Sequence, residues 1–136
     1  MDINIIRLFF DTGLLVLIWM VQLVVYPSFL YYEKQNLVKW HKNYTSGLSI
    51  IVIPLMFGQL IVVSIQLYRL VSAETIISLL LVISVWILTF KQFVPLHDKI
   101  SKNKVTDKLL KLLVIRNWLR TILWTFIFCW GIFSNL

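Results

Sequence analysis

Four long apolar segments limit what this chain can fold into more than any other feature of its sequence. A transmembrane helix needs about 20 mostly apolar residues, and each segment is close to that length. Together they occupy most of the 136 residues, which leaves no room for a soluble domain. The segments run from Gly13 to Tyr32, from Leu48 to Tyr68, from Thr75 to Phe90 with Phe93 and Val94 beyond it, and from Trp118 to Leu136.

The composition agrees with a chain that lies mostly in a membrane. Hydrophobic residues make up 60% of the sequence and charged residues 14%, whereas a soluble domain has about 45–50% and 25%. We therefore predict an all-α fold, a single integral membrane domain over residues 1–136 that forms an up-down antiparallel four-helix bundle. Its spans are expected at about 12–32, 46–69, 74–95 and 113–134.

The basic residues are distributed unevenly over the connections between the spans. Ten of them lie in the first and third connections, and only Arg7 and Arg69 lie on the opposite side. The positive-inside rule places basic connections in the cytoplasm, so both termini are expected on the non-cytoplasmic side of a bacterial cytoplasmic (inner) membrane. The net charge of +7 then reflects contacts to the anionic headgroups of membrane lipids and not to nucleic acid.

Local signals mark the ends of the helices. Ser72 is a suitable N-cap for the third span, and Thr106 or Asp107 for a fourth helix that starts in water and continues into the membrane. Pro95 is expected to interrupt the third helix and to aim His97 back over the end of the bundle. Because Asp2 precedes it, the first apolar segment does not resemble a cleavable signal peptide.

Polar side chains within the spans point to one level of the bundle. Such groups are costly in a membrane, usually face the bundle interior and mark function. Asn117 and Arg120 lie three residues apart and so share a face of the fourth helix, while Arg116 is closer to water and is expected to reach lipid phosphates. His41 precedes the second span and His97 follows the third, which places both at the cytoplasmic end.

Further polar groups extend this level toward the membrane centre. Tyr26 lies near the cytoplasmic end of the first span, Tyr44 lies one turn after His41, and Gln22 and Gln59 are expected to pair deeper inside. Taken singly, each has an ordinary explanation, such as the interfacial aromatic belt or a helix–helix hydrogen bond. Taken together, they predict a polar pocket. Its candidate catalytic residues are His41, His97 and Arg120, its candidate substrate-binding residues are Gln22, Tyr26, Tyr44 and Asn117, and no residue is assigned to a metal.

Several short motifs give the chain a familiar pattern. These are YPSF at 26–29, WHKNY at 40–44, IPLMFGQ at 53–59, TFKQFVPLHD at 89–98 and NWLRTILW at 117–124. The pattern resembles an uncharacterised family of small four-span bacterial membrane proteins. More distantly, it is similar to the anthrone-oxygenase-like membrane proteins, which have a proline-containing motif after span three and a Trp…Arg-Thr motif at the start of span four. Pro95 and the group Trp118, Arg120 and Thr121 match that layout, whereas His97 stands where threonine and asparagine are expected.

The sequence leaves three functions open. The first is a membrane-embedded enzyme, such as an oxidoreductase, that acts on a quinone-, phenol- or lipid-like substrate, with a histidine as acid–base group and Arg120 stabilising negative charge. The second is a haem or metal protein with His41 and His97 as ligands, although no haem-attachment motif is present. The third is a non-enzymatic lipid-binding or assembly subunit, which includes a homo-oligomer. The sequence specifies neither a cofactor nor a substrate.

Overall fold

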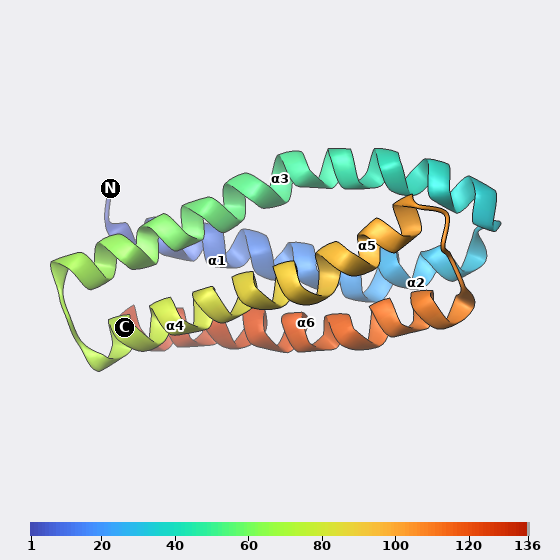
Figure 1. Ribbon diagram of the computed structural model, residues 1–136. Helices are drawn as coiled ribbons and strands as arrows, with labels where there is room; N and C mark the ends of the chain where they lie inside the picture. Colours follow the sequence, from blue (N-terminus) through green and yellow to red (C-terminus); the bar gives the residue numbers. More distant parts are fainter. Residues whose placement is uncertain (136) are drawn as a thin grey trace.

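The computed structural model describes residues 1–135, and nearly all of them are helical. The first long helix comprises α1, a widened π-helical turn η1, the short α2 and a 3₁₀ turn η2. The second is α3, the third comprises α4, a second π-helical turn η3 and α5, and the fourth is α6 (Figure 1). The bounds are Ile3–Met20 for α1, Val21–Val25 for η1, Tyr26–Ser28 for α2, Phe29–Tyr31 for η2, Lys34–Arg69 for α3, Ala73–Leu88 for α4, Thr89–Phe93 for η3, Val94–Ser101 for α5 and Asp107–Asn135 for α6.

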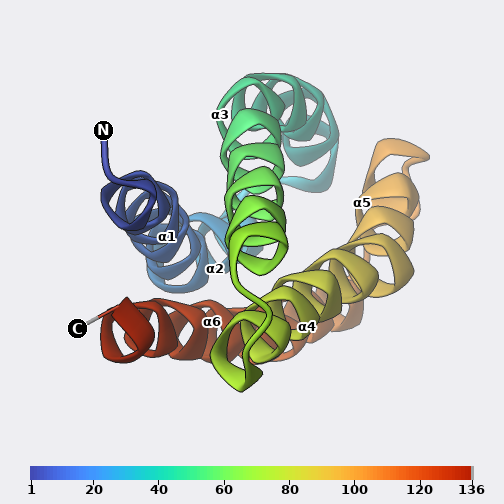
Figure 2. The ribbon, with the colours of Figure 1, turned by 90° about the vertical axis from the view of Figure 1, so that its left-hand side faces the viewer.

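The four long helices form an up-down antiparallel bundle, as the sequence predicts. Helix α1 packs between α3 and α6, and α4 packs between the same two helices on the other side. The view along the bundle shows this ring of four (Figure 2). Both ends of the chain lie at the end of the bundle where α3 turns into α4, and α2 and α5 lie at the other end (Figure 1). We call these the terminal end and the α2–α5 end.

All four long helices are long and apolar enough to span a membrane. They cover Ile3–Tyr31, Lys34–Arg69, Ala73–Ser101 and Asp107–Asn135. Large apolar side chains are exposed on each of them, for example Val16 (62%), Ile50 (77%), Leu80 (58%) and Ile122 (62%). An exposed apolar surface of this extent is typical of a lipid-facing exterior, so the chain is a multi-pass membrane protein.

Short polar side chains cap the helices where the sequence predicts them. Ser72 Oγ accepts from the backbone N–H of Thr75 at 3.4 Å, and Thr75 Oγ1 accepts from the backbone N–H of Ser72 at 3.0 Å. This reciprocal arrangement is a capping box. At the start of α6, Thr106 Oγ1 accepts from the backbone N–H of Leu109 at 3.1 Å. Thr106 is therefore the cap, and Asp107 is the first residue of the helix.

The two π-helical turns lie next to prolines. Pro27 is the second residue of α2, which follows η1, and Pro95 is the second residue of α5, which follows η3. A π turn holds one more residue than an α turn and frequently occurs at functional sites. The third helix is thus not broken at Pro95, as the sequence suggests, but widened just before it. Beyond each widened turn, the helix places Tyr26 and His97 on its inner side, where both meet other polar groups.

Candidate functional site

A continuous hydrogen-bonded network fills the interior of the α2–α5 end. Its inner part starts at Asn117, whose amide Nδ2 donates to Gln22 Oε1 at 2.9 Å. Thr121 Oγ1 donates to the same Gln22 oxygen at 3.1 Å, and Gln22 Nε2 donates to the backbone oxygen of Val114 at 3.2 Å. All four groups of this inner part come from η1 and α6, so the amides tie the first and fourth helices together.

Arg120 links the amides to the aromatic part of the network. Its Nε and Nη2 donate to Asn117 Oδ1 at 3.0 and 2.6 Å, and Nη2 also donates to Tyr26 OH at 3.0 Å. The guanidinium carbon lies 3.5 Å from the centre of the Phe93 ring, which is a cation–π contact. These contacts hold the guanidinium in place on three sides.

The two histidines follow in line from Tyr26. Tyr26 OH and His97 Nε2 are 2.9 Å apart, and His97 Nδ1 and His41 Nε2 are 2.6 Å apart. His41 Nδ1 then lies 3.4 Å from Ser101 Oγ. The chain of contacts thus runs from Arg120 through Tyr26, His97 and His41 to Ser101. It joins the first, second, third and fourth long helices at the level the sequence predicts.

A cavity of about 390 Å³ adjoins this network. The sequence-predicted residues Tyr26, Tyr44, His97 and Arg120 line one part of it. Most of the remaining walls are apolar and come from all four long helices; they include Val52, Met56, Phe93 and Trp124. Four wall residues on α3 and on the α4–α5 helix are also about half exposed on the outer surface, namely Ile53, Phe57, Phe90 and Val94. The cavity therefore reaches the surface that faces the acyl chains.

Among residues 1–135, no carboxylate pairs with the positive charge of Arg120. Arg120 is only 8% exposed, and within residues 1–135 the ion pairs are Arg7–Asp11 and Lys102–Asp98 alone. Its Nη1 makes no hydrogen bond to any residue in the described range, whereas Nε and Nη2 are fully used. A buried charge without a counter-charge is costly. The nitrogen without a partner, Nη1, belongs to Arg120, which lines the cavity.

Tyr44 adds a second unused polar group. Its hydroxyl is buried and has no hydrogen-bond partner among residues 1–135, although Tyr44 lines the cavity. Leaving a buried hydroxyl unpaired costs about 1–3 kcal/mol, and such groups are rare in folded proteins. An occupant of the cavity with an oxygen atom would satisfy both Tyr44 and Arg120.

The sequence-predicted site residues divide into two groups in the structure. Tyr26, Tyr44, His97 and Arg120 line the cavity, whereas Asn117 and Gln22 lie behind Arg120 and position it. His41 is completely buried but does not line the cavity, because His97 lies between them. Sequence reasoning missed the contributions of Phe93 and Ser101 to this network. Arg116 is exposed, as expected.

The expected pairing of Gln22 with Gln59 is wrong. Gln59 Nε2 donates to Asp11 Oδ1 at 2.7 Å, and Gln59 Oε1 accepts from Trp124 Nε1 at 3.3 Å. Asp11 and Gln22 are eleven residues apart on one helix, which corresponds to about 16 Å along its axis. Because Gln59 faces Asp11, it is too far from Gln22 to pair with it.

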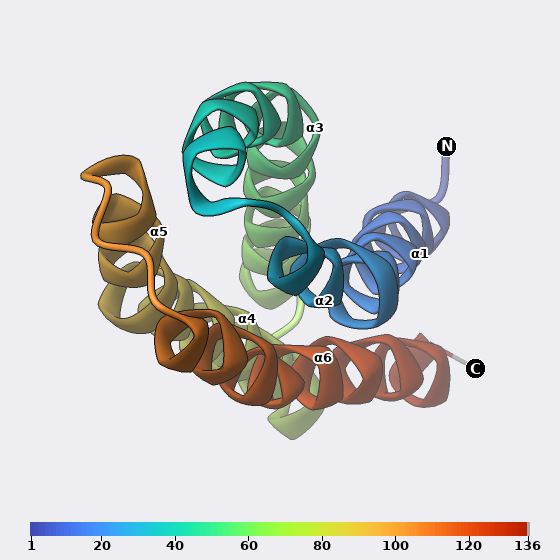
Figure 3. The same cartoon turned by 90° about the vertical axis from the view of Figure 1, so that its right-hand side faces the viewer.

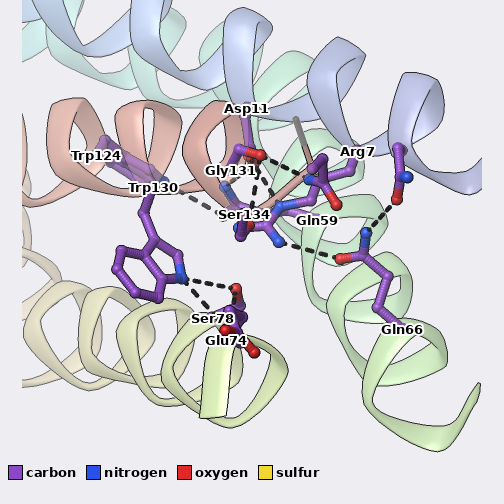
Figure 4. Close-up of polar contacts among 12 residues, drawn as sticks. Arg7, Asp11, Gln59, Gln66, Glu74, Ser78, Trp124, Trp130, Gly131 and Ser134 are labelled. Carbon is purple, nitrogen blue, oxygen red and sulfur yellow. Dashed lines mark hydrogen bonds and ion pairs between the residues drawn. The ribbon is translucent and has the colours of Figure 1, made fainter. Parts of the chain in front are cut away.

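Gln59 belongs to a second buried cluster, at the terminal end, that sequence reasoning missed (Figure 4). Arg7 Nε donates to Asp11 Oδ2 at 3.2 Å, and Arg7 Nη1 donates to Gln66 Oε1 at 3.1 Å. Gln66 Nε2 in turn donates to Asn4 Oδ1 at 2.9 Å. Arg7 and Asp11 are each only 2% exposed. The sequence signal was their opposite charge at a spacing of four residues, which is the spacing of an ion pair on one helix face.

The absence of a side chain at Gly131 allows this ion pair to pack against α6 (Figure 4). A Cβ atom at this position would lie 2.7 Å from Asp11 Oδ2 and 3.1 Å from Arg7 Nε. The first of these distances is too short for any real Cβ contact, so the ion pair would have to move. Gly131 thus lets two helices enclose a charged pair away from lipid.

The histidine pair leaves no space for a metal between its rings. The two nearest nitrogens are 2.6 Å apart, and the ring centres are 4.9 Å apart in a stacked arrangement. A metal needs each imidazole nitrogen at about 2 Å, and a haem iron with two axial histidines needs the nitrogens on opposite sides of the porphyrin. Across the part of the chain described, no three His, Cys, Asp or Glu side chains gather as a metal site.

The fold and the site together define a four-helix membrane protein with a lipid-accessible cavity and an internal polar network. Comparisons of the sequence with protein-family profiles and with curated proteins, and of the structure with solved structures, give no match. The functional conclusion below therefore starts from the geometry of the site and the pattern of the sequence.

Proposed function

We propose that this protein is a membrane enzyme that binds a hydrophobic molecule carrying an oxygen head group, such as a phenol or a quinone, and exchanges a proton with it. One observation carries the proposal. The cavity combines apolar walls that reach the lipid-facing surface with the guanidinium of Arg120, which has no carboxylate partner in the described part of the chain. A substrate that partitions into the bilayer could enter such a cavity from the side.

The residues at the polar part of the cavity have distinct roles in this proposal. Arg120 Nη1 holds the oxygen of the substrate and stabilises negative charge on it. Tyr44 donates a second hydrogen bond from its unpartnered hydroxyl. His97, with Tyr26, is the acid–base group, since a neutral imidazole accepts a proton on one ring nitrogen and donates one from the other. Asn117 and Gln22 keep Arg120 in position. An oxidoreductase is the reaction class that best suits a phenol or quinone substrate, and it also agrees with the distant resemblance to anthrone oxygenases.

The location of the site in the membrane follows from the distribution of charge. Eight of the nine lysines lie in the start of α3, the end of α5, the connection between α5 and α6 and the start of α6; they include Lys34, Lys42 and Lys104. By the positive-inside rule, the α2–α5 end is cytoplasmic and both termini are outside. We place the protein in the cytoplasmic (inner) membrane of a bacterium.

Two other functions give different results in the same experiments. A lipid-binding or assembly subunit, including a homo-oligomer, would retain phospholipid in the cavity and show no preference for a phenol. A haem protein would purify with a Soret band, which the direct contact between the two histidines argues against.

The test is direct binding to the purified protein. Small molecules that co-purify are extracted and identified by mass spectrometry, and binding of 1-naphthol or decylubiquinone is followed through quenching of tryptophan fluorescence, because Trp86 and Trp124 line the cavity. We expect saturable binding that Arg120→Gln weakens at least tenfold, which is about 1.4 kcal/mol.

Arg116 provides a matched control on the same helix. It is exposed and lies one turn from Arg120, so Arg116→Gln removes the same charge without touching the cavity and should leave affinity unchanged. Equal affinity for wild type and Arg120→Gln, or the absence of saturable binding to either probe, would show that the cavity does not serve this function.

A further inference from the structure

We propose that Tyr26, His97, His41 and Ser101 form a path along which a proton leaves the cavity and reaches the aqueous face at the α2–α5 end. The inference depends on the proposed function, because the proton comes from the acid bound in the cavity. It adds a direction, an exit and a role for His41, which does not touch the cavity.

The direction follows from counting donors at Tyr26. Its oxygen accepts a hydrogen bond from Arg120 Nη2, and its other partner in the described range is His97 Nε2 at 2.9 Å. Arginine only donates, so the hydroxyl hydrogen of Tyr26 is satisfied only if it points to His97, and buried polar groups are in general hydrogen-bonded. His97 Nε2 is therefore the acceptor, and the neutral ring of His97 carries its hydrogen on Nδ1.

The same logic fixes the hydrogens beyond His97. His97 Nδ1–H donates to His41 Nε2 over 2.6 Å. The neutral ring of His41 then carries its hydrogen on Nδ1, which faces Ser101 Oγ at 3.4 Å. Every hydrogen in the line thus points away from the cavity and toward Ser101. Arg120 sets this direction from the inner end, because a guanidinium can only donate and the hydrogen bond from Arg120 to Tyr26 cannot be reversed.

Burial agrees with a path that is insulated in the middle and open at its two ends. Tyr26 and His97 line the cavity, His41 is 0% exposed, and Ser101 is exposed at the end of α5. Figure 3 looks onto this end of the bundle and shows α5 and the chain that follows it at the surface, beside the start of α3. The charged side chains close to the exit, Asp98 and Lys102, are exposed and pair with each other at 2.8 Å.

The transfer step balances as one proton out. The hydroxyl proton of the bound phenol moves to the Tyr26 oxygen as the Tyr26 proton moves to His97 Nε2. The Nδ1 proton of His97 moves to His41 Nε2, and the Nδ1 proton of His41 passes by way of Ser101 to water. The phenolate that remains is held by Arg120. Each imidazole then carries its hydrogen on the other nitrogen, and return of a proton along the line restores the starting state.

The experiment uses 4-nitro-1-naphthol, a hydrophobic phenol that becomes yellow when it ionises. The dye is bound to the purified protein, the pH is raised in a stopped-flow mixer, and the rate of ionisation of the bound dye is read from its absorbance. We expect His41→Phe to keep the affinity of the wild type within about twofold and to slow ionisation at least tenfold. Added imidazole should restore part of the rate, because it replaces the missing proton carrier.

Further variants separate a proton path from a structural role. Ser101→Ala should slow ionisation less than His41→Phe, since water can take the place of the hydroxyl at the exposed exit. Ser46→Ala is the matched control, because Ser46 is also exposed on a helix but bonds only to the backbone oxygen of Lys42. Should His41→Phe fail to fold, His41→Gln retains a polar side chain that does not relay protons as imidazole does, and it should show the same slow ionisation.

The two proposals fail in different ways. A dye that does not bind saturably to the wild type contradicts the proposed function, and the proton path with it. A dye that binds to His41→Phe or His41→Gln and ionises as fast as in the wild type contradicts the proton path alone.

Discussion

Each end of the bundle buries an arginine, and the two arginines have different partners. At the terminal end, Arg7 has Asp11 beside it and Gln66 in front of it, so its charge is neutralised within the protein. At the α2–α5 end, Arg120 contacts an amide, a hydroxyl and an aromatic ring, but no carboxylate of residues 1–135. Both are nearly inaccessible, so the difference lies in their partners and not in their burial.

This difference separates a structural cluster from a candidate working site. Arg7 Nη2 also makes no hydrogen bond among residues 1–135, but Asp11 already neutralises the charge of Arg7, so this cluster ties helices together without a ligand. An unpaired buried charge destabilises the fold. Such a charge is usually retained in a membrane protein because it has a function. The partners of a buried charge, more than its presence, therefore indicate where the chemistry of this protein takes place.

The largest expected effect comes from removing the counter-charge of Arg7. Asp11→Leu leaves the guanidinium buried without a negative partner and should lower the free energy of unfolding by about 3–5 kcal/mol, measured by denaturant titration in mixed micelles. The double variant Arg7→Met with Asp11→Leu removes both charges and should recover most of the loss. A double variant as unstable as Asp11→Leu would mean that the amides around the pair matter more than its charges.

A smaller effect is expected where the ion pair contacts α6. Gly131→Ala forces the pair to move, at a cost of about 1–3 kcal/mol for overpacking, of which about 1 kcal/mol is recovered because alanine favours the helix. Gly47 is the matched control, since a Cβ atom there meets no other atom within 4 Å. Gly47→Ala should therefore stabilise the protein by up to about 1 kcal/mol in the same titration. If both glycines respond alike, the close packing of the pair against α6 is of no consequence.

The smallest effect concerns the two tyrosines at the α2–α5 end. Tyr44→Phe removes an unpartnered hydroxyl and should leave the ligand-free protein as stable as the wild type or about 1 kcal/mol more stable. Tyr26→Phe removes a hydroxyl with two partners and should destabilise it by about 1 kcal/mol. Changes of opposite sign in the free energy of unfolding would distinguish the hydroxyl of Tyr44, which has no partner in the ligand-free protein, from that of Tyr26, which has two. A clear loss for Tyr44→Phe would show that its hydroxyl has an internal partner.

The sequence was sufficient for the fold and for most of the network at the α2–α5 end. The length of the apolar segments determines four spans, and short connections force neighbouring helices to run antiparallel. His41, His97 and Arg120 then meet because each lies near the end of a span on the same side of the bundle. Their distance from the end of each span determines the level at which they lie, and this distance can be counted along the sequence.

The remaining features depend on side-chain direction, which a count along the sequence does not give. Arg7 and Asp11 lie outside the first apolar segment, which begins at Gly13, whereas α1 begins at Ile3 and includes both residues on its buried face. The partner of Gln59 depends on the register between α1 and α3. The position of His41 behind His97 depends on the direction of α5 after η3. No residue pattern before Pro95 predicts the π-helical turn.

The two widened turns have a consequence for how this protein can change. An α-helix turns by about 100° per residue, and a π turn holds one residue more than an α turn. If η1 or η3 closed to an ordinary turn without losing a residue, everything beyond it would rotate by about that angle. Tyr26 or His97 would then swing away from the bundle axis, while the spans kept their packing upstream. Deletion of one residue within the turn would instead leave the inner face beyond it in place, so the extra residue of each widened turn is matched to the register of the side chains that follow it.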